Sequence, residues 1–162
     1  MPTNTYTPLG TITLSASASE VIFSGIPASL NGQSFRDLVV IIAGTSASTT
    51  TFGIRFNGDS GNNYTYVEMN GQGSGLTESS AGTLSYALMG RSGSQQSTST
   101  FQLLDYTATD KHKTALARGG QQTEIVRASA ARWANTAAIT SLTVTGSNWN
   151  SGTTMSIYGI AG

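Results

Sequence analysis

One short apolar run constrains the fold of this chain more than any other stretch. Residues 38–43, Leu-Val-Val-Ile-Ile-Ala, form its only long uninterrupted apolar segment. A short run this rich in β-branched residues is typical of a strand buried on both faces. Residues 52–57, Phe-Gly-Ile-Arg-Phe-Asn, alternate apolar and polar side chains, which predicts a half-buried strand. The small polar residues between them predict a loop, so we expect these two strands to pair as a hairpin.

The rest of the chain consists of short strand-like segments separated by turn residues. Residues 124–133 contain enough alanine for a helix, but they alternate small and large side chains and lie between strands, so a strand is predicted there. Two glycine- and serine-rich segments, 70–82 and 90–97, predict loops, and the first is expected to be the longest mobile one. About ten short strands without a fixed repeat predict an all-β fold, a two-sheet antiparallel β-sandwich with jelly-roll topology.

The composition supports an all-β domain. Serine, threonine and glycine occupy 22, 24 and 19 of the 162 positions, and only 10% of the residues are charged. Threonine suits strands and glycine and serine suit turns, while a chain this poor in charge does not have the composition of a charge-rich disordered protein. The length fits one domain, which we expect to be an extended N-terminal arm at residues 1–8 followed by a single sandwich domain at 9–162.

Charge and segment patterns limit the partners that can be expected. Eight basic and eight acidic residues cancel, and no basic cluster is larger than the one at 110–113, so no nucleic-acid partner is predicted. The first eight residues lack the pattern of a secretion signal, and no run approaches the length of a membrane span. No cysteine is present to form a disulfide or a thiolate metal site.

The candidates for catalysis are weak. His112 lies between two lysines in a predicted turn, where a solvated loop residue is favoured over a general base. Residues 90–94 have the wrong spacing for a nucleophile elbow, and residues 71–75 lack the lysine of a phosphate-binding loop. Carboxylates that could act in pairs are scattered along the chain at Asp59, Glu68, Glu78 and Asp105. No catalytic residue and no cofactor is therefore predicted.

One turn is a candidate metal site. Oxygen-bearing side chains recur in Asn57, Asp59, Asn62 and Asn63, and calcium accepts such ligands. Calcium usually needs more than one carboxylate, however, and Asn and Asp also stabilise tight turns. A structural turn is favoured over a calcium site.

Aromatic side chains could form a platform for a sugar. The candidates for glycan contact are Trp149, Tyr64 and Tyr66, and Trp149 lies in a predicted turn, where it would be the most exposed. The alternative, which we favour, is that Trp149 covers the end of the sandwich core.

A series of short blocks runs in order along most of the chain. They are residues 21–27 (Val-Ile-Phe-Ser-Gly-Ile-Pro), 35–41 (Phe-Arg-Asp-Leu-Val-Val-Ile), 54–59 (Ile-Arg-Phe-Asn-Gly-Asp) with Asn63-Tyr64, 137–142 (Ala-Ala-Ile-Thr-Ser-Leu) and 156–160 (Ser-Ile-Tyr-Gly-Ile). In combination they resemble small structural proteins of tailed bacteriophages. The resemblance implies a β-sandwich component of the virion and offers no catalytic residue to carry over.

The single-domain length selects among the functions that this resemblance implies. A stand-alone domain fits a capsid decoration (cement) protein that binds and stabilises the head shell, made in the cytoplasm of the bacterial host and located in the virion. By analogy, the expected partners are its own copies in a homotrimer and the major capsid protein or other virion proteins, with neither nucleic acid nor a membrane. The alternatives are a tail or fibre module that binds a host receptor or glycan and, third, a polysaccharide depolymerase.

Overall fold

The described part of the chain is built entirely from strands and their connections. The structure is a computed structural model that describes residues 5–73, 75, 77–122 and 125–162. Its strands are β1 (Tyr6–Thr13), β2 (Val21–Ser24), β3 (Ser29–Leu30), β4 (Gln33–Gly44), β5 (Thr50–Phe56), β6 (Tyr64–Gln72), β7 (Thr77–Leu84), β8 (Ala87–Ser92), β9 (Ser97–Leu104), β10 (Lys113–Gln121), β11 (Ile125–Trp133), β12 (Ser141–Thr145) and β13 (Thr154–Ala161). Among these residues the structure contains no helix that is long and apolar enough to cross a membrane.

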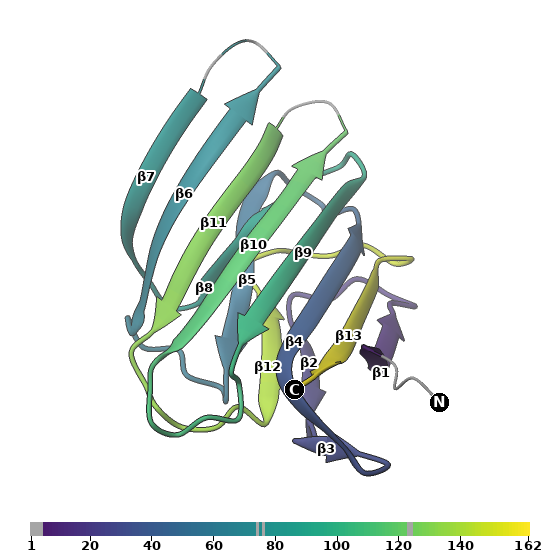
Figure 1. Cartoon of the computed structure of the whole chain (residues 1–162). Helices are drawn as coiled ribbons and strands as arrows, with labels where there is room; N and C mark the ends of the chain where they lie inside the picture. Colours follow the sequence, from purple (N-terminus) through teal and green to yellow (C-terminus); the bar gives the residue numbers. More distant parts are fainter. Residues whose placement is uncertain (1–4, 74, 76, 123–124) are drawn as a thin grey trace.

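The strands form two antiparallel sheets that face each other (Figure 1). The large sheet has the order β1-β13-β4-β9-β10-β11-β6-β7, with the short β3 paired to β4. The small sheet has the order β2-β12-β5-β8. The predicted all-β sandwich is confirmed.

Eight of the strands have the connectivity of a jelly roll. Without β3, β6, β7, β10 and β11, the two sheets reduce to β1-β13-β4-β9 and β2-β12-β5-β8. The first and last strands are then neighbours, and most steps along the chain pass from one sheet to the other, as in a double-sheet jelly roll. The prediction of jelly-roll topology is thereby confirmed.

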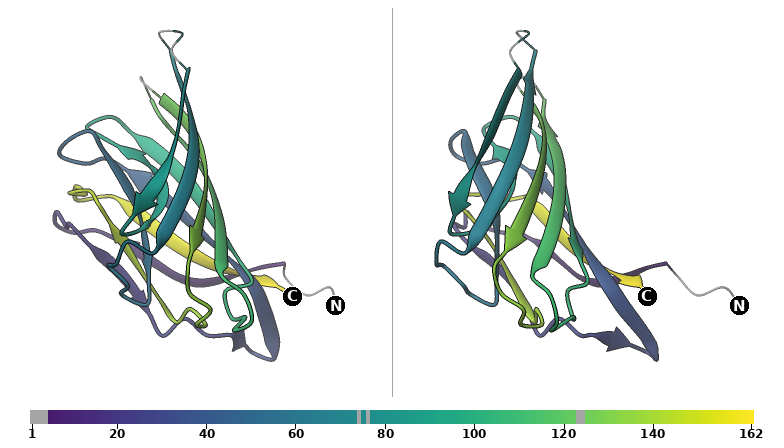
Figure 2. Two further views of the ribbon diagram at one scale, coloured as in Figure 1. Left: turned by 90° about the vertical axis from the view of Figure 1, so that its left-hand side faces the viewer. Right: turned by 60° about the vertical axis from the view of Figure 1, so that its left-hand side comes forward.

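The remaining four long strands widen one sheet only. The β6–β7 and β10–β11 pairs add to β9 in the order β10-β11-β6-β7, and they project past the small sheet (Figure 2). The inner face of this four-stranded extension is partly covered by β8, which packs against β10 and β11. Its outer face has no layer of the described chain over it.

The core lies between the sheets and is rich in aromatic side chains. Along β11 every second side chain is buried, from Ile125 to Trp133, and β9 and β10 alternate in the same way. Burial of such a face is the main driving force of the fold. The largest fully buried aromatic side chains are Trp133, Trp149, Tyr64, Tyr106, Phe52, Phe56 and Phe101.

The predicted hairpin over residues 36–59 is wrong. β4 pairs with β13 and β9 in the large sheet, whereas β5 pairs with β12 and β8 in the small sheet. The connection between them crosses the sandwich and is anchored at Ser46, whose N–H donates to the Gly93 carbonyl and whose hydroxyl donates to Ser92. A short polar connection suits a hairpin and a sheet crossing equally well, so the local pattern could not separate them.

Three further predictions concern the length and pairing of segments. The proposed mobile loop at 70–82 is mostly strand, because β6 extends to Gln72 and β7 begins at Thr77. Of the extended arm predicted at 1–8, Tyr6 to Pro8 pair with β13 as the start of β1, while residues 1–4 lie outside the described residues. The strand at 124–133 is confirmed from Ile125 onward.

Candidate functional site

The loop proposed for calcium is held by hydrogen bonds to the protein itself. Asp59 Oδ2 accepts from Trp133 Nε1 at 2.7 Å and from Asn63 Nδ2 at 3.0 Å, and Asp59 Oδ1 accepts from the Gly61 N–H at 2.9 Å. These donors, with the Trp133 indole as the main cause, hold the pKa of Asp59 below its usual range. The carboxylate is therefore engaged in fixing the turn.

Asn57 forms its hydrogen bonds with a different part of the chain from Asp59, residues 138–141. Its Oδ1 accepts from the N–H groups of Thr140 and Ser141, and its Nδ2 donates to the Ala138 carbonyl. Asn57 also has a positive φ of 52°, a conformation that asparagine tolerates better than most residues. No group of three or more His, Cys, Asp or Glu side chains suited to a metal is found among the described residues. The bonds of Asn57 and Asp59 hold this loop as a tight turn, which is the role that we favoured for it, while calcium binding stays untested.

Two of the three aromatic residues proposed for glycan contact are buried. Trp149 and Tyr64 are both 0% exposed, and only Tyr66 is partly exposed. Trp149 packs edge-on against Phe52 with ring centroids 4.7 Å apart, while the Tyr64 hydroxyl donates to the Asp59 carbonyl. The glycan platform is not assembled, and the interpretation of Trp149 as a cover over the core is correct.

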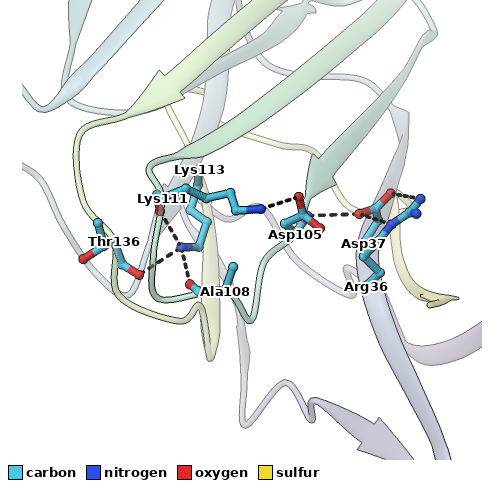
Figure 3. Close-up of polar contacts among 7 residues, drawn as sticks. All are labelled: Arg36, Asp37, Asp105, Ala108, Lys111, Lys113 and Thr136. Atoms are coloured by element: carbon cyan, nitrogen blue, oxygen red, sulfur yellow. Dashed lines mark hydrogen bonds and ion pairs between the residues drawn. The ribbon is translucent and has the colours of Figure 1, made fainter.

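Lys113 is a buried cation that the sequence analysis took for part of a polar turn. Its side chain is 1% exposed, and its Nζ donates to the carbonyls of Ala108, Lys111 and Thr136 at 2.6, 3.2 and 3.0 Å (Figure 3). Burial lowers the pKa of Lys113. The neighbouring His112 is exposed, as expected for a solvated loop residue. Lys113 thus ties the connection before β10 to the one after β11.

The same end of the sandwich holds a second polar cluster (Figure 3). Asp37, 2% exposed, accepts from the Asp105 N–H at 3.0 Å, from Gln102 Nε2 at 3.3 Å and from the Arg36 guanidinium at 3.2 Å. Asp105 in turn forms an exposed ion pair with Lys111 at 3.3 Å. These contacts fix loop geometry, and two of the four scattered carboxylates, Asp59 and Asp105, are therefore accounted for.

The other two carboxylates lie on one face of the β6–β7 pair. Register places Glu68 opposite Ser80 and Glu78 opposite Asn70, so the two glutamates are diagonal neighbours. Glu68 is nevertheless engaged, because its Oε1 accepts from Ser80 at 2.8 Å and its Oε2 lies 3.2 Å from Arg127 Nε. Glu78 is exposed on β7, the last strand of the large sheet.

Arg127 joins the extension to the small sheet. It is 6% exposed, its Nε donates to Asn70 Oδ1 at 2.6 Å, and its Nη1 donates to the Gly90 carbonyl of β8 at 3.3 Å. With Glu68 on the neighbouring strand β6 it forms an ion pair within the large sheet. Because Arg127 on β11 bonds both to Asn70 on β6 and to Gly90 on β8, it orients β6 and β11 against β8.

The outer face of the large sheet is the surface left without a partner layer. Of the eight large hydrophobic side chains that are exposed in the described chain, six lie on this face, and the other two are Ile22 and Leu30. The six are Tyr6 (56%), Ile41 (36%), Val67 (52%), Met69 (65%), Leu116 (49%) and Val126 (70%). Isolated exposed apolar residues are ordinary, but a concentration on one face marks an interaction surface.

Register shows that the exposed apolar side chains form rows across neighbouring strands. Leu116 lies opposite Ala130, which lies opposite Val67, and one level along the sheet Arg118, Ala128 and Met69 form a parallel row. Sequence reasoning missed this face because, apart from residues 38–43, it assigned each strand one buried side and treated the other as solvated. In β6 the apolar Val67 and Met69 alternate with the polar Glu68 and Asn70, and the polar residues are the buried ones, so the alternation in the sequence indicated the wrong side.

Comparison with known proteins adds little. No family model and no curated protein matches the chain. Among solved structures, the chain is similar to the exo-inulinase of Aspergillus awamori at 14% identity and a TM-score of 0.46, over 95% of this chain and 29% of that one. The chain therefore spans less than a third of that structure, and a similarity this weak says nothing about activity.

Proposed function

We propose that this protein is a structural component of a bacteriophage virion, and in particular a capsid decoration protein that binds and stabilises the head shell. One observation carries the proposal. The outer face of the large sheet presents six of the eight large exposed hydrophobic side chains of the described chain, and on their inner side its strands pack against the core or against β8. A rigid, partly apolar face of this kind suits attachment to another protein surface.

The chemical groups of the chain also favour attachment over catalysis. Asp59, Glu68, Asp105 and Lys113 are each engaged in contacts that hold loops or strands in place. The surface is poor in charged side chains and rich in serine and threonine, which lose little side-chain entropy when they become ordered at an interface. The sequence resemblance to small phage structural proteins supports the same function.

The assembly that we propose is a homotrimer attached to the major capsid protein, with neither nucleic acid nor a membrane as a partner. Several copies in one trimer would bind the shell together, so that modest contacts at each site give strong attachment. A receptor- or glycan-binding tail module is the alternative. The aromatic residues that motivated it are now known to be mostly buried, and no other observation favours it.

The test is the location of the protein in phage particles. Cryo-electron microscopy and quantitative mass spectrometry of virions of a phage that encodes the chain should find hundreds of copies on the head. A handful of copies confined to the tail, or none in the particle, would refute the proposal. Sedimentation of the purified protein should give the mass of a trimer.

The face used for attachment can be tested separately. Heads that lack the protein would be incubated with recombinant wild type or with Met69→Glu, which places a charge on the outer face of the large sheet. Ile22→Glu is the matched control, because Ile22 is 57% exposed on the small sheet, close to the 65% of Met69. Met69→Glu should weaken rebinding to heads at least about ten-fold, as burying an unpaired charge costs more than about 1.4 kcal/mol. Equal rebinding by both variants would exclude this face.

A further inference from the structure

The outer face of the extension contains a trough that runs along β11. Its floor is formed by two small side chains, Ala128 and Ala130, because β11 has only a methyl group at each of these outward positions. Its walls are the longer side chains of the neighbouring strands, Leu116 and Arg118 on β10 and Val67 and Met69 on β6. We call this feature, with Val126 at one end and Arg132 at the other, the β11 trough.

Two hollows mark the trough on the surface. One, of about 330 Å³, is lined by Val67, Met69, Ala128 and Ala130. The next, of about 320 Å³, continues past Val67 and Ala130 to Thr114 and Arg132. From Val126 to Arg132 the trough spans six residue steps of a strand, or roughly 20 Å. Its length and narrow floor fit an extended segment of about seven residues better than a helix, which is about 10 Å wide.

Charge selects the kind of segment. Arg118 and Arg132 are exposed, and neither side chain has a hydrogen bond or an ion pair with another described residue. Among the described carboxylates, Glu68 borders the first hollow, but its carboxylate is paired with Arg127. Asp37, which faces outward on β4, is 2% exposed and bonded to its own neighbours. A second copy of this face would carry the same two arginines and so would not supply carboxylates for them. The positive charge of these two arginines therefore favours a partner that carries carboxylates.

The spacing of the two arginines sets the spacing of those carboxylates. Arg118 lies level with Ala128, and Arg132 stands four residues further along β11. Side chains at positions i, i+2 and i+4 of an extended segment point to the same side. Between the two arginine levels lies the apolar level of Leu116, Ala130 and Val67.

From this geometry we infer that the β11 trough binds an extended segment of another protein with the pattern acidic-x-aliphatic-x-acidic. The first and last carboxylates lie at Arg118 and Arg132, and the aliphatic side chain packs between Leu116 and Val67. The inference rests on the proposed function, since it names the chemistry of the shell segment that the outer face would hold.

The test uses synthetic peptides and the full chain. The heptapeptide Val-Thr-Glu-Thr-Val-Thr-Glu would be titrated into isotope-labelled protein while the backbone amide resonances are followed by NMR. Saturable shifts are expected at Ala128, Ala130, Leu116 and Val67. The same peptide with glutamine in place of glutamate should bind more weakly, and the version with lysine should give no saturable shifts.

Protein variants test the arginines directly. Arg118→Gln and Arg132→Gln should each weaken the acidic peptide about two- to five-fold, the size expected for partly exposed ion pairs. Lys111→Gln is the control, because Lys111 is an exposed cation in a loop and should bind as the wild type does. Far-UV circular dichroism confirms that the variants keep their fold.

Several outcomes would overturn the inference. They are equal binding of the acidic and basic peptides, shifts confined to the small sheet, no shifts at millimolar peptide, and displacement of the peptide at lower concentration by single-stranded DNA. A self-associated form that buries the trough in sedimentation and NMR experiments would assign it to a second copy instead. If the protein is found on phage heads but does not bind the peptide, only the inference about the trough is refuted. If it binds the peptide but is not found on the heads, only the proposed virion function is refuted.

Discussion

Replacement of Asp59 by alanine should destabilise the domain by a predictable amount. Asp59 Oδ2 accepts from the indole N–H of Trp133, which is 2% exposed, and without this acceptor the N–H is left buried and unsatisfied. Such a loss costs about 1–3 kcal/mol, and the lost bond to the Gly61 N–H adds about 0.5–1.5 kcal/mol. A total of about 1.5–4.5 kcal/mol lowers Tm by roughly 3–18 °C in a domain of this size.

The same carboxylate should make stability depend on pH. Hydrogen bonding from Trp133 lowers the pKa of Asp59 in the folded state below the ordinary 3.8. A lowered carboxyl pKa contributes stability at neutral pH, and this contribution disappears as the pH falls through the folded pKa. The difference in unfolding free energy between wild type and Asp59→Asn should therefore be largest near neutral pH and shrink in acid.

Urea unfolding followed by tryptophan fluorescence measures both effects. Glu78→Ala is the control, because Glu78 is exposed on β7, and it should change stability by no more than about 0.5 kcal/mol. The reasoning fails if Asp59→Ala is no less stable than Glu78→Ala. It also fails if the difference between wild type and Asp59→Asn is the same at about pH 7 and about pH 3.

Two further predictions concern buried polar side chains. Lys113→Met keeps the volume of the side chain but removes the donor from three carbonyls, so it should lower the unfolding free energy by about 1–3 kcal/mol. Lys111→Met breaks only an exposed ion pair and should cost at most about 1 kcal/mol. Equal urea midpoints for the two variants would contradict this prediction. Burial raises the pKa of Tyr106 to about 12, so its contribution to stability is complete below 10.0, the ordinary value, and is lost as the pH rises towards 12. Alkaline unfolding followed by tyrosinate absorbance should therefore be less steep in Tyr106→Phe than in wild type, and identical curves would argue against this role.

Local sequence was sufficient wherever the strand pattern and turn residues decide the structure. The alternation in residues 125–133 predicted β11 in spite of its alanine content, because tertiary neighbours override a modest helix propensity. The Asn57-Gly58 turn was also predictable, since both residues adopt positive φ there. Jelly-roll topology was predicted for the sandwich as a whole, whereas the order of the strands was not.

Which strands pair with one another depended on the tertiary structure. Whether β4 pairs with β5 or crosses to another sheet is decided by β13, β9, β12 and β8, which are distant in sequence. The burial of Trp149 and Lys113 likewise follows from loops that meet only in the folded chain.

The sequence by itself determined the class of this protein, a neutral all-β domain with few groups suited to chemistry. Tertiary structure decided which faces are covered. β6, β10 and β11 each carry apolar side chains on both sides. The alternation of side chains along a strand, with its period of two residues, does not indicate which side meets the small sheet. Only the packing of β8 on the inner side leaves Val67, Leu116 and Arg118 outside, and this choice creates the surface to which we assign function.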